Sequence, residues 1–198
     1  MTLRRGRGDA GQVFPIYITV VAGLLFVAFA FFAVGQAAVK RNEAQTAADA
    51  AALAAAQETR DELADLWALA VLDPTKWLGI FHGEGGSDHC DRAVELAAMN
   101  DATVQCVPDG PLSYSVEATT NKPIGQSVVP DTAGMHVHAD AVAVIEPLCD
   151  FDLPGQTPPG DTLPTLECDD DVDWVLDPAD LTDLPGPEDL FDVHLADG

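Results

Sequence analysis

The most constraining feature of the sequence is an uncharged segment at residues 13–39, which reads VFPIYITVVAGLLFVAFAFFAVGQAAV. An α-helix needs about 20 predominantly apolar residues to cross the roughly 30 Å hydrocarbon core of a bilayer. These twenty-seven residues are therefore long enough to span a membrane. Pro15 suits the first turn of a helix, and Phe14 and Tyr17 suit the depth of the lipid headgroups. The segment predicts a transmembrane helix.

Strong helix formers continue beyond the span, and no Pro or Gly interrupts them before Pro74. One helix is therefore expected from about Pro15 to Leu72, roughly 87 Å long at 1.5 Å per residue. In this prediction residues 40–73 form an alanine-rich rod. Its small side chains would let a neighbouring helix approach closely at Ala47, Ala48, Ala51 and Ala52. An apolar stripe farther along would pack either on the protein's own head or on a helix of another subunit. The stripe consists of Leu63, Leu66, Trp67, Ala70 and Val71.

Residues 1–12 form a short basic leader that contains Arg4, Arg5 and Arg7. Basic residues are enriched on the cytoplasmic side of membrane spans. Lys40 and Arg41 follow the span, so the charge difference between its two ends is small. We predict a single-pass protein of the cell membrane with a cytoplasmic amino terminus and an extracytoplasmic carboxyl-terminal region.

Past Pro74 the pattern predicts a small α+β head over residues 74–146. A glycine-rich loop is followed by the helical segment HCDRAVELAAMN, for which Ser87 or Asp88 is the expected N-cap. Three segments with alternating apolar side chains come next, ATVQCV, LSYSVEATT and MHVHADAVAVI. Such alternation is typical of half-buried strands, so we expect a three-stranded meander.

The four cysteines all lie beyond the predicted span, which suits an oxidising compartment. We favour a disulfide between Cys90 and Cys106, which would tie the second helix to the first strand. A second disulfide between Cys149 and Cys168 would close a loop in the remaining chain. Each bond is expected to stabilise the fold by about 3 kcal/mol. A zinc site is the alternative, although the chain lacks the CxxC spacing typical of such sites.

Residues 147–198 contain fifteen Asp or Glu and eight Pro, and they contain no Lys or Arg. This composition does not bury enough apolar surface to fold alone, so we predict a largely disordered acidic tail. The tail either docks its scattered apolar side chains on a partner or remains solvated. Its carboxylates would bind divalent cations weakly, and its negative charge excludes nucleic acid as a partner.

Two patterns resemble parts of metal sites. A partial calcium-loop spacing is present at Asp169, Asp171, Asp173 and Asp180. Trp174 stands where such a loop needs Gly, which argues against a dedicated site. His136 and His138 share one face of a predicted strand, but no third ligand follows at a recognisable spacing. The sequence also has no G-x-S-x-G, phosphate loop or H-E-x-x-H motif, so we predict no enzyme, no cofactor and no metal site.

The segment from RGDAGQ to AAAQ, about 50 residues long, resembles the amino-terminal part of TadE/TadG-like pseudopilins of the tight-adherence, or Flp-type, pilus system, notably of actinobacteria. In that family a short basic leader ending in Gly precedes an apolar helix, and an alanine-rich segment follows the helix. Gly11 and the run QTAADAAALA, residues 45–54, stand at those positions here. The resemblance implies cleavage of the leader between Gly11 and Gln12.

Processed leaders of this family carry Glu at the fifth mature residue, where this chain has Ile16. A carboxylate at that depth would need the amino terminus of a neighbouring subunit as its partner. Since Ile16 provides none, the resemblance implies a minor or assembly component with a pilin-like head. Its partners would be the lipid bilayer and other pilus-system membrane proteins, reached through the span and the rod. The alternative is a stand-alone single-pass surface protein whose head and acidic tail bind a protein partner or divalent cations.

Overall fold

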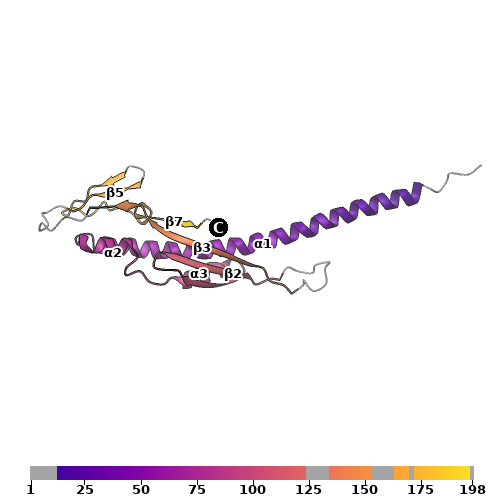
Figure 1. Cartoon of the computed structure of the whole chain (residues 1–198), viewed down its shortest axis with the longest axis horizontal. Helices are drawn as coiled ribbons and strands as arrows, with labels where there is room; N and C mark the ends of the chain where they lie inside the picture. Colours follow the sequence, from indigo (N-terminus) through magenta and orange to yellow (C-terminus); the bar gives the residue numbers. More distant parts are fainter. Residues whose placement is uncertain (1–12, 124–133, 153–162, 170–171, 197–198) are drawn as a thin grey trace, which may run out of the picture.

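The computed structural model describes residues 13–123, 134–152, 163–169 and 172–196. The fold is organised around one long helix, α1 (Val13–Leu69), as the sequence predicts. The amino-terminal half of α1 projects as a single helix, and its carboxyl-terminal half lies within an α+β head (Figure 1). The helix ends at Leu69 rather than Leu72 because its last turn tightens, with Val71 N–H donating to the Ala68 carbonyl at 3.4 Å.

Four short helical elements complete the helical part of the described chain. They are the 3₁₀ turn η1 (Pro74–Lys76), α2 (Trp77–Phe81), α3 (Cys90–Met99) and α4 (Pro187–Leu190). The N-cap of α3 is His89, which makes no side-chain capping hydrogen bond, rather than Ser87 or Asp88 as predicted. The Asp88 carboxylate lies one residue earlier and accepts a 2.9 Å hydrogen bond from the Cys90 N–H. Helix α3 ends at Met99, followed by Asn100 as its C-cap.

The main sheet has four antiparallel strands in the order β1-β2-β3-β7. They are β1 (Ala102–Pro108), β2 (Ser113–Thr120), β3 (His138–Pro147) and β7 (Phe191–Leu195). The predicted three-stranded meander is confirmed by β1, β2 and β3, which pair with their neighbours in chain order. Strand β7 was not predicted, and it extends the sheet by pairing with residues 143–147 of β3.

A smaller antiparallel sheet lies in the segment that we predicted to be a disordered acidic tail. Its strands are β4 (Cys149–Asp150), β5 (Leu166–Cys168) and β6 (Val172–Trp174). Leu166, Leu190 and Phe191 are fully buried, so the described residues of this segment belong to the folded head. The prediction failed because it judged the segment by itself, whereas its few large apolar side chains pack on elements supplied by the rest of the chain.

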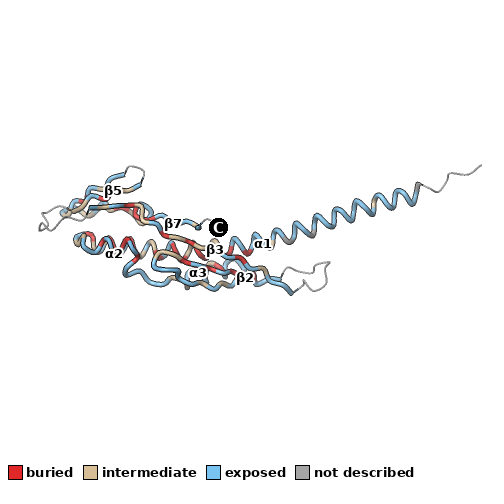
Figure 2. The backbone as a smooth tube through the Cα atoms, in the orientation of Figure 1, coloured by how far each residue is buried: buried red, intermediate tan, exposed pale blue. Residues whose placement is uncertain are grey.

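The core next to the projecting half of α1 is built from small side chains. One face of the helix is fully buried at Ala44, Ala47, Ala48, Ala51, Ala52, Ala55 and Ala56. Strands β2 and β3 lie against this helix and bury Ala118, Ala139, Ala141 and Ala143. We expected the alanine face to be open to a neighbouring helix. The chain's own sheet covers it instead, as Figure 2 shows by the buried segments of α1 within the head.

The opposite end of the core is aromatic. The rings of Trp67 and Trp77 lie 5.5 Å apart, and those of Phe81 and Phe191 lie 5.1 Å apart. Phe151 joins the two pairs, with ring centroids 5.4 Å from Trp77 and 5.5 Å from Phe81. The apolar stripe at the end of the predicted rod therefore packs on the protein's own head, which is one of the two alternatives raised by the sequence.

Candidate membrane anchor and its support in the head

The projecting half of α1 exposes nearly all of its apolar side chains. Among them are Phe14, Phe26, Phe29, Phe31, Phe32 and Val39, each more than half exposed. None of the most apolar part of this helix is buried by the rest of the chain (Figure 2). The hydroxyl of Thr19 donates to the Pro15 carbonyl at 2.8 Å, which satisfies this polar group inside an apolar stretch. By length and composition this helix is able to cross a membrane.

Paired charges mark the junction between the projecting helix and the head. Lys40 pairs with Glu43 at 2.6 Å, and Lys122, two residues after the end of β2, pairs with Asp101 at 2.6 Å. A shallow groove of about 270 Å³ is lined by residues of both pairs and by Met99, Asn100 and Thr120. The hydrogen bond from Lys122 lowers the pKa of Asp101 and raises that of Lys122, so both groups stay charged at neutral pH.

A polar clamp fastens α1 to the loop before α3. The Glu62 carboxylate accepts hydrogen bonds from the Ser87 N–H at 2.6 Å and from the Ser87 hydroxyl at 2.8 Å. Nε2 of His89 lies 2.9 Å from the same carboxylate. The pKa of Glu62 is lowered mainly by the backbone hydrogen bond from Ser87, which exceeds the rise caused by desolvation, and further by the contacts with His89 and the Ser87 hydroxyl.

A pair of buried hydroxyl groups lies next to the polar clamp. The hydroxyls of Thr59 and Tyr114 are 2.6 Å apart, and the Tyr114 oxygen also lies 3.3 Å from the His89 N–H. The sequence analysis did not single out Thr59, Glu62 or Tyr114. The sequence did contain one indication of this site. Thr59 and Glu62 are three residues apart, which places them on the same side of a helix.

This clamp does not have the geometry of a nucleophilic catalytic site. A catalytic serine needs its hydroxyl bonded to a base that a third group orients. Here the Ser87 hydroxyl donates directly to the Glu62 carboxylate, which leaves it held as a structural donor. The arrangement therefore explains how the head is attached to α1.

Two disulfides reinforce the head. Cys90 and Cys106 join α3 to β1 with their Cα atoms 5.6 Å apart, and Cys149 and Cys168 join β4 to β5 with theirs 3.9 Å apart. These are the pairings favoured from the sequence, and all four cysteines are used. Since each bond closes a loop of fewer than about 20 residues, each restrains the unfolded chain locally.

The histidines and aspartates considered as metal ligands lie apart. His136 contacts the Thr120 carbonyl at 2.6 Å, whereas His138 contacts the Thr119 hydroxyl at 2.9 Å. Of the partial calcium loop, Asp171 lies outside the described residues, and Asp180 bonds to the Thr182 hydroxyl at 2.6 Å. Within the described part of the chain, no group of three or more His, Cys, Asp or Glu could hold a metal ion. Gly11 and Gln12 lie outside the described residues as well.

Comparison with known families gives one match, which covers residues 11–58. Its description is "Putative Flp pilus-assembly TadE/G-like". The amino-terminal segment of this chain is similar to that family. No curated protein and no solved structure matches the chain. The TadE/G-like segment contains the exposed apolar half of α1 and the alanine face that the sheet covers, whereas the strands of the head lie outside it.

The segment that resembles the TadE/G-like family is thus the one that carries a helix long and apolar enough to cross a membrane. In a water-soluble monomer an apolar surface of this size would be unusual, and such surfaces mark contact with lipid or protein. The candidate functional site of this chain is therefore the exposed apolar surface along the projecting half of α1.

Proposed function

We propose that this protein is a minor or assembly component, pseudopilin-like in construction, of a Tad/Flp-type pilus or a related secretion machine. The observation that carries the proposal is the exposed apolar half of α1 inside the TadE/G-like segment. The helix runs without a break from this half into the head. It therefore holds the head at a fixed height above the bilayer, as a rigid spacer would.

The proposed orientation places the amino terminus in the cytoplasm and the head outside it. Arg4, Arg5 and Arg7 precede the span, and the disulfides of the head suit an oxidising compartment. The mature chain would begin at or before Gln12, with the span retained, because the helical pattern continues from the apolar stretch into the head. Ile16 in place of the Glu typical of processed leaders favours a minor role over that of the polymerising subunit.

The proposed contacts with other pilus-system membrane proteins lie on the exposed half of α1. The alanine face does not serve this purpose, because the sheet buries it completely. The open positions include Gly23 and Gly35, around which a built Cβ meets nothing within 4 Å. Small residues at exposed helix positions favour close helix packing in membranes.

Site-specific photo-crosslinking in the native cell tests this proposal. A benzophenone amino acid replaces Phe26, which is 74 % exposed on the projecting helix, or Val175, which is 83 % exposed on the head. We expect protein adducts from position 26 that disappear in a strain lacking the pilus-assembly genes. Position 175 is the matched control, since it has similar exposure outside the span.

A stand-alone surface protein gives a different result. It needs the apolar helix only as a lipid anchor, so position 26 would give lipid adducts and no protein adducts. Protein adducts from position 175 that persist without the pilus-assembly genes would also favour this alternative. Either result contradicts the proposed role in pilus assembly.

A further inference from the structure

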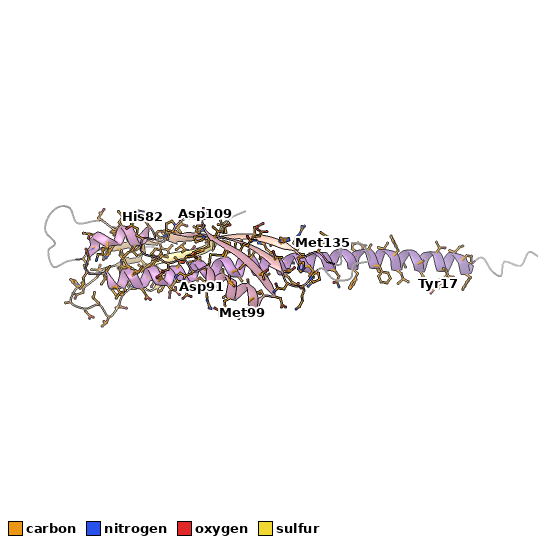
Figure 3. The ribbon with its side chains drawn as sticks, turned by 90° about the horizontal axis from the view of Figure 1, so that it is seen from below. Tyr17, His82, Asp91, Met99, Asp109 and Met135 are labelled. Carbon is orange, nitrogen blue, oxygen red and sulfur yellow. A yellow bond between two sulfur atoms is a disulfide. The ribbon has the colours of Figure 1, made fainter. Side chains whose placement is uncertain are left out.

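The side of the head nearest to the projecting helix forms a rim around α1. We define the basal rim as Val39, Lys40, Arg41, Met99, Asn100, Asp101, Lys122 and Met135. Val39 and Asn100 line one shallow groove, and Lys40 and Lys122 line another together with Met99 and Asp101. The turn between α3 and β1 therefore lies level with the first charged residues after the apolar stretch. Figure 3 shows Met135 at the end of the head that faces the projecting helix.

The position of the basal rim along α1 places it at the depth of lipid headgroups. About 20 residues at 1.5 Å each fill the hydrocarbon core, so a span that begins near Phe14 leaves the core a few residues before Val39. The headgroup layer on each side is about 5–7 Å thick, which corresponds to four or five helical residues. The layer therefore ends near Val39, which places Lys40 and Arg41 at its outer edge, and Ala44, the first fully buried residue of α1 in the head, comes three residues after Arg41.

The distribution of charge sets this rim apart from the rest of the head. The chain carries a net charge of −24, with 33 acidic and 9 basic residues. The basic residues beyond the leader are Lys40, Arg41, Arg60, Lys76, Arg92 and Lys122. Half of them belong to the basal rim, in which Lys122 pairs with Asp101, while Lys40 pairs with Glu43 next to the rim. Three cations therefore face two carboxylates. The rim therefore carries a net positive charge within a strongly acidic protein.

Apolar side chains stand between these cations. Met99 is 75 % exposed, Val39 is 55 % exposed and Met135 is 54 % exposed. Lys122 keeps 69 % of its side chain exposed despite its pairing with Asp101, so its ammonium group remains accessible. Exposed methionines beside lysines suit the boundary between headgroups and acyl chains, because long basic side chains extend their charge toward the polar layer.

We propose that the basal rim is a docking surface for anionic lipid headgroups, through Lys40, Arg41 and Lys122 with Met99 and Met135 as shallow apolar contacts. The proposal rests on the proposed function only in requiring that α1 spans a bilayer. It holds for either orientation, since both leaflets present headgroups. Basic residues are attracted to an anionic surface, and the acidic remainder of the head is repelled. The two effects hold the head upright on the membrane.

Depth measurement with a spin label tests the docking on the full chain in lipid nanodiscs. Because the native cysteines are paired in disulfides, Asn100→Cys provides a single reactive thiol on the rim. Asp109→Cys, at an exposed position far from the projecting helix in Figure 3, is the matched control. The readout is the accessibility of the nitroxide to a water-soluble nickel complex, compared between neutral phosphatidylcholine discs and discs that contain phosphatidylglycerol.

We expect the phosphatidylglycerol discs to lower the nickel accessibility at position 100 by at least about twofold and to leave position 109 unchanged. Replacing Arg41 and Lys122 by Gln should remove the difference, whereas replacing Lys76 and Arg92 by Gln should preserve it. Equal accessibility in the two kinds of disc, or a difference that survives the Arg41 and Lys122 substitutions, overturns the proposal. A label at Leu25→Cys reports insertion separately, so failure of the anchor is distinguishable from failure of the docking.

Discussion

Glu62 on α1 and Ser87 in the loop before α3 are joined by two hydrogen bonds, both accepted by the Glu62 carboxylate, at 2.6 Å and 2.8 Å. The residues are far apart in the sequence, and the contact closes the glycine-rich loop onto the helix. Gly86 lies against the same helix, since a Cβ added there would be 3.4 Å from the Leu63 side chain. One carboxylate and a tightly packed loop therefore fasten the start of α3 to α1, in addition to the packing of the fully buried Ala93 and Ala97.

Replacing Glu62 by Gln should lower the free energy of unfolding of the head by about 1–2 kcal/mol, because a neutral amide accepts hydrogen bonds less strongly and keeps only one of the two oxygens that accept from Ser87. Chemical denaturation in detergent, followed by near-ultraviolet circular dichroism of the buried tryptophans, measures the change. Glu58→Gln is the matched control, since Glu58 is exposed and reaches Arg92 only at 3.9 Å. Equal losses of unfolding free energy in the two variants would contradict a stabilising role for the hydrogen bonds of Glu62.

The hydrogen bonds between Glu62 and Ser87 also predict how the stability of the head changes with pH. The pKa of Glu62 in the folded head lies below its ordinary value of 4.5, so the carboxylate contributes its full stabilisation above pH 4.5. This contribution is lost as the pH falls through the lowered pKa. The stability difference between the wild type and Glu62→Gln should therefore be constant near neutrality and shrink in acid. A difference that grows below pH 4.5 would have the wrong sign.

Replacing Ala51 by Leu should destabilise the head by about 1–3 kcal/mol, because this face of α1 has no space left beneath the sheet. Gln57→Leu adds the same side chain at an exposed position of the same helix and should have little effect. Thermal unfolding of the two variants measures the difference. If Ala51→Leu leaves the head stable and disrupts only crosslinking to other proteins, the alanine face is an intermolecular surface after all.

Removing the ring of Phe191 should release the carboxyl-terminal segment from the head. Phe191 is fully buried at the start of β7 and stacks near Phe81, so Phe191→Ala is expected to cost about 3–5 kcal/mol. Limited proteolysis should then cut residues 163–196 faster than in the wild type. Val175→Ala, at a residue 83 % exposed, should leave the digestion pattern unchanged. Rapid digestion of these residues in the wild type would instead support the disordered tail that the sequence predicted.

Local patterns in the sequence were enough to predict α1 and the β1-β2-β3 meander. An uninterrupted run of helix formers and three segments of alternating apolar side chains can be recognised from neighbouring residues alone. Strand β7 carries a similar alternation in Phe191, Val193 and Leu195, but the acidic composition around it outweighed this signal. Its stability comes from pairing with β3, which is a contact between distant parts of the chain.

The alanine face shows a different limit of sequence interpretation. Ala47, Ala48, Ala51 and Ala52 indicate that something approaches the helix closely, and both a neighbouring helix and the protein's own sheet satisfy that requirement. Only the fold decides between them, by burying these residues completely. The clamp at Glu62 was missed for a related reason, since its partners Ser87 and His89 come from a loop that carries no periodic pattern.

Topology can be tested with single added thiols and a membrane-impermeant maleimide. Gln12→Cys lies directly before the span and is kept whether or not the leader is cleaved, and Asp183→Cys lies at an exposed position of the head. The positive-inside bias of the leader and the disulfides of the head predict that Asp183→Cys reacts on intact cells and that Gln12→Cys reacts only after permeabilisation. The wild type is the control for background, because its native cysteines are held in disulfides. Reaction of Gln12→Cys on intact cells, with Asp183→Cys protected, would reverse the proposed orientation. The head would then lie in the reducing cytoplasm, where its disulfides are not expected to persist.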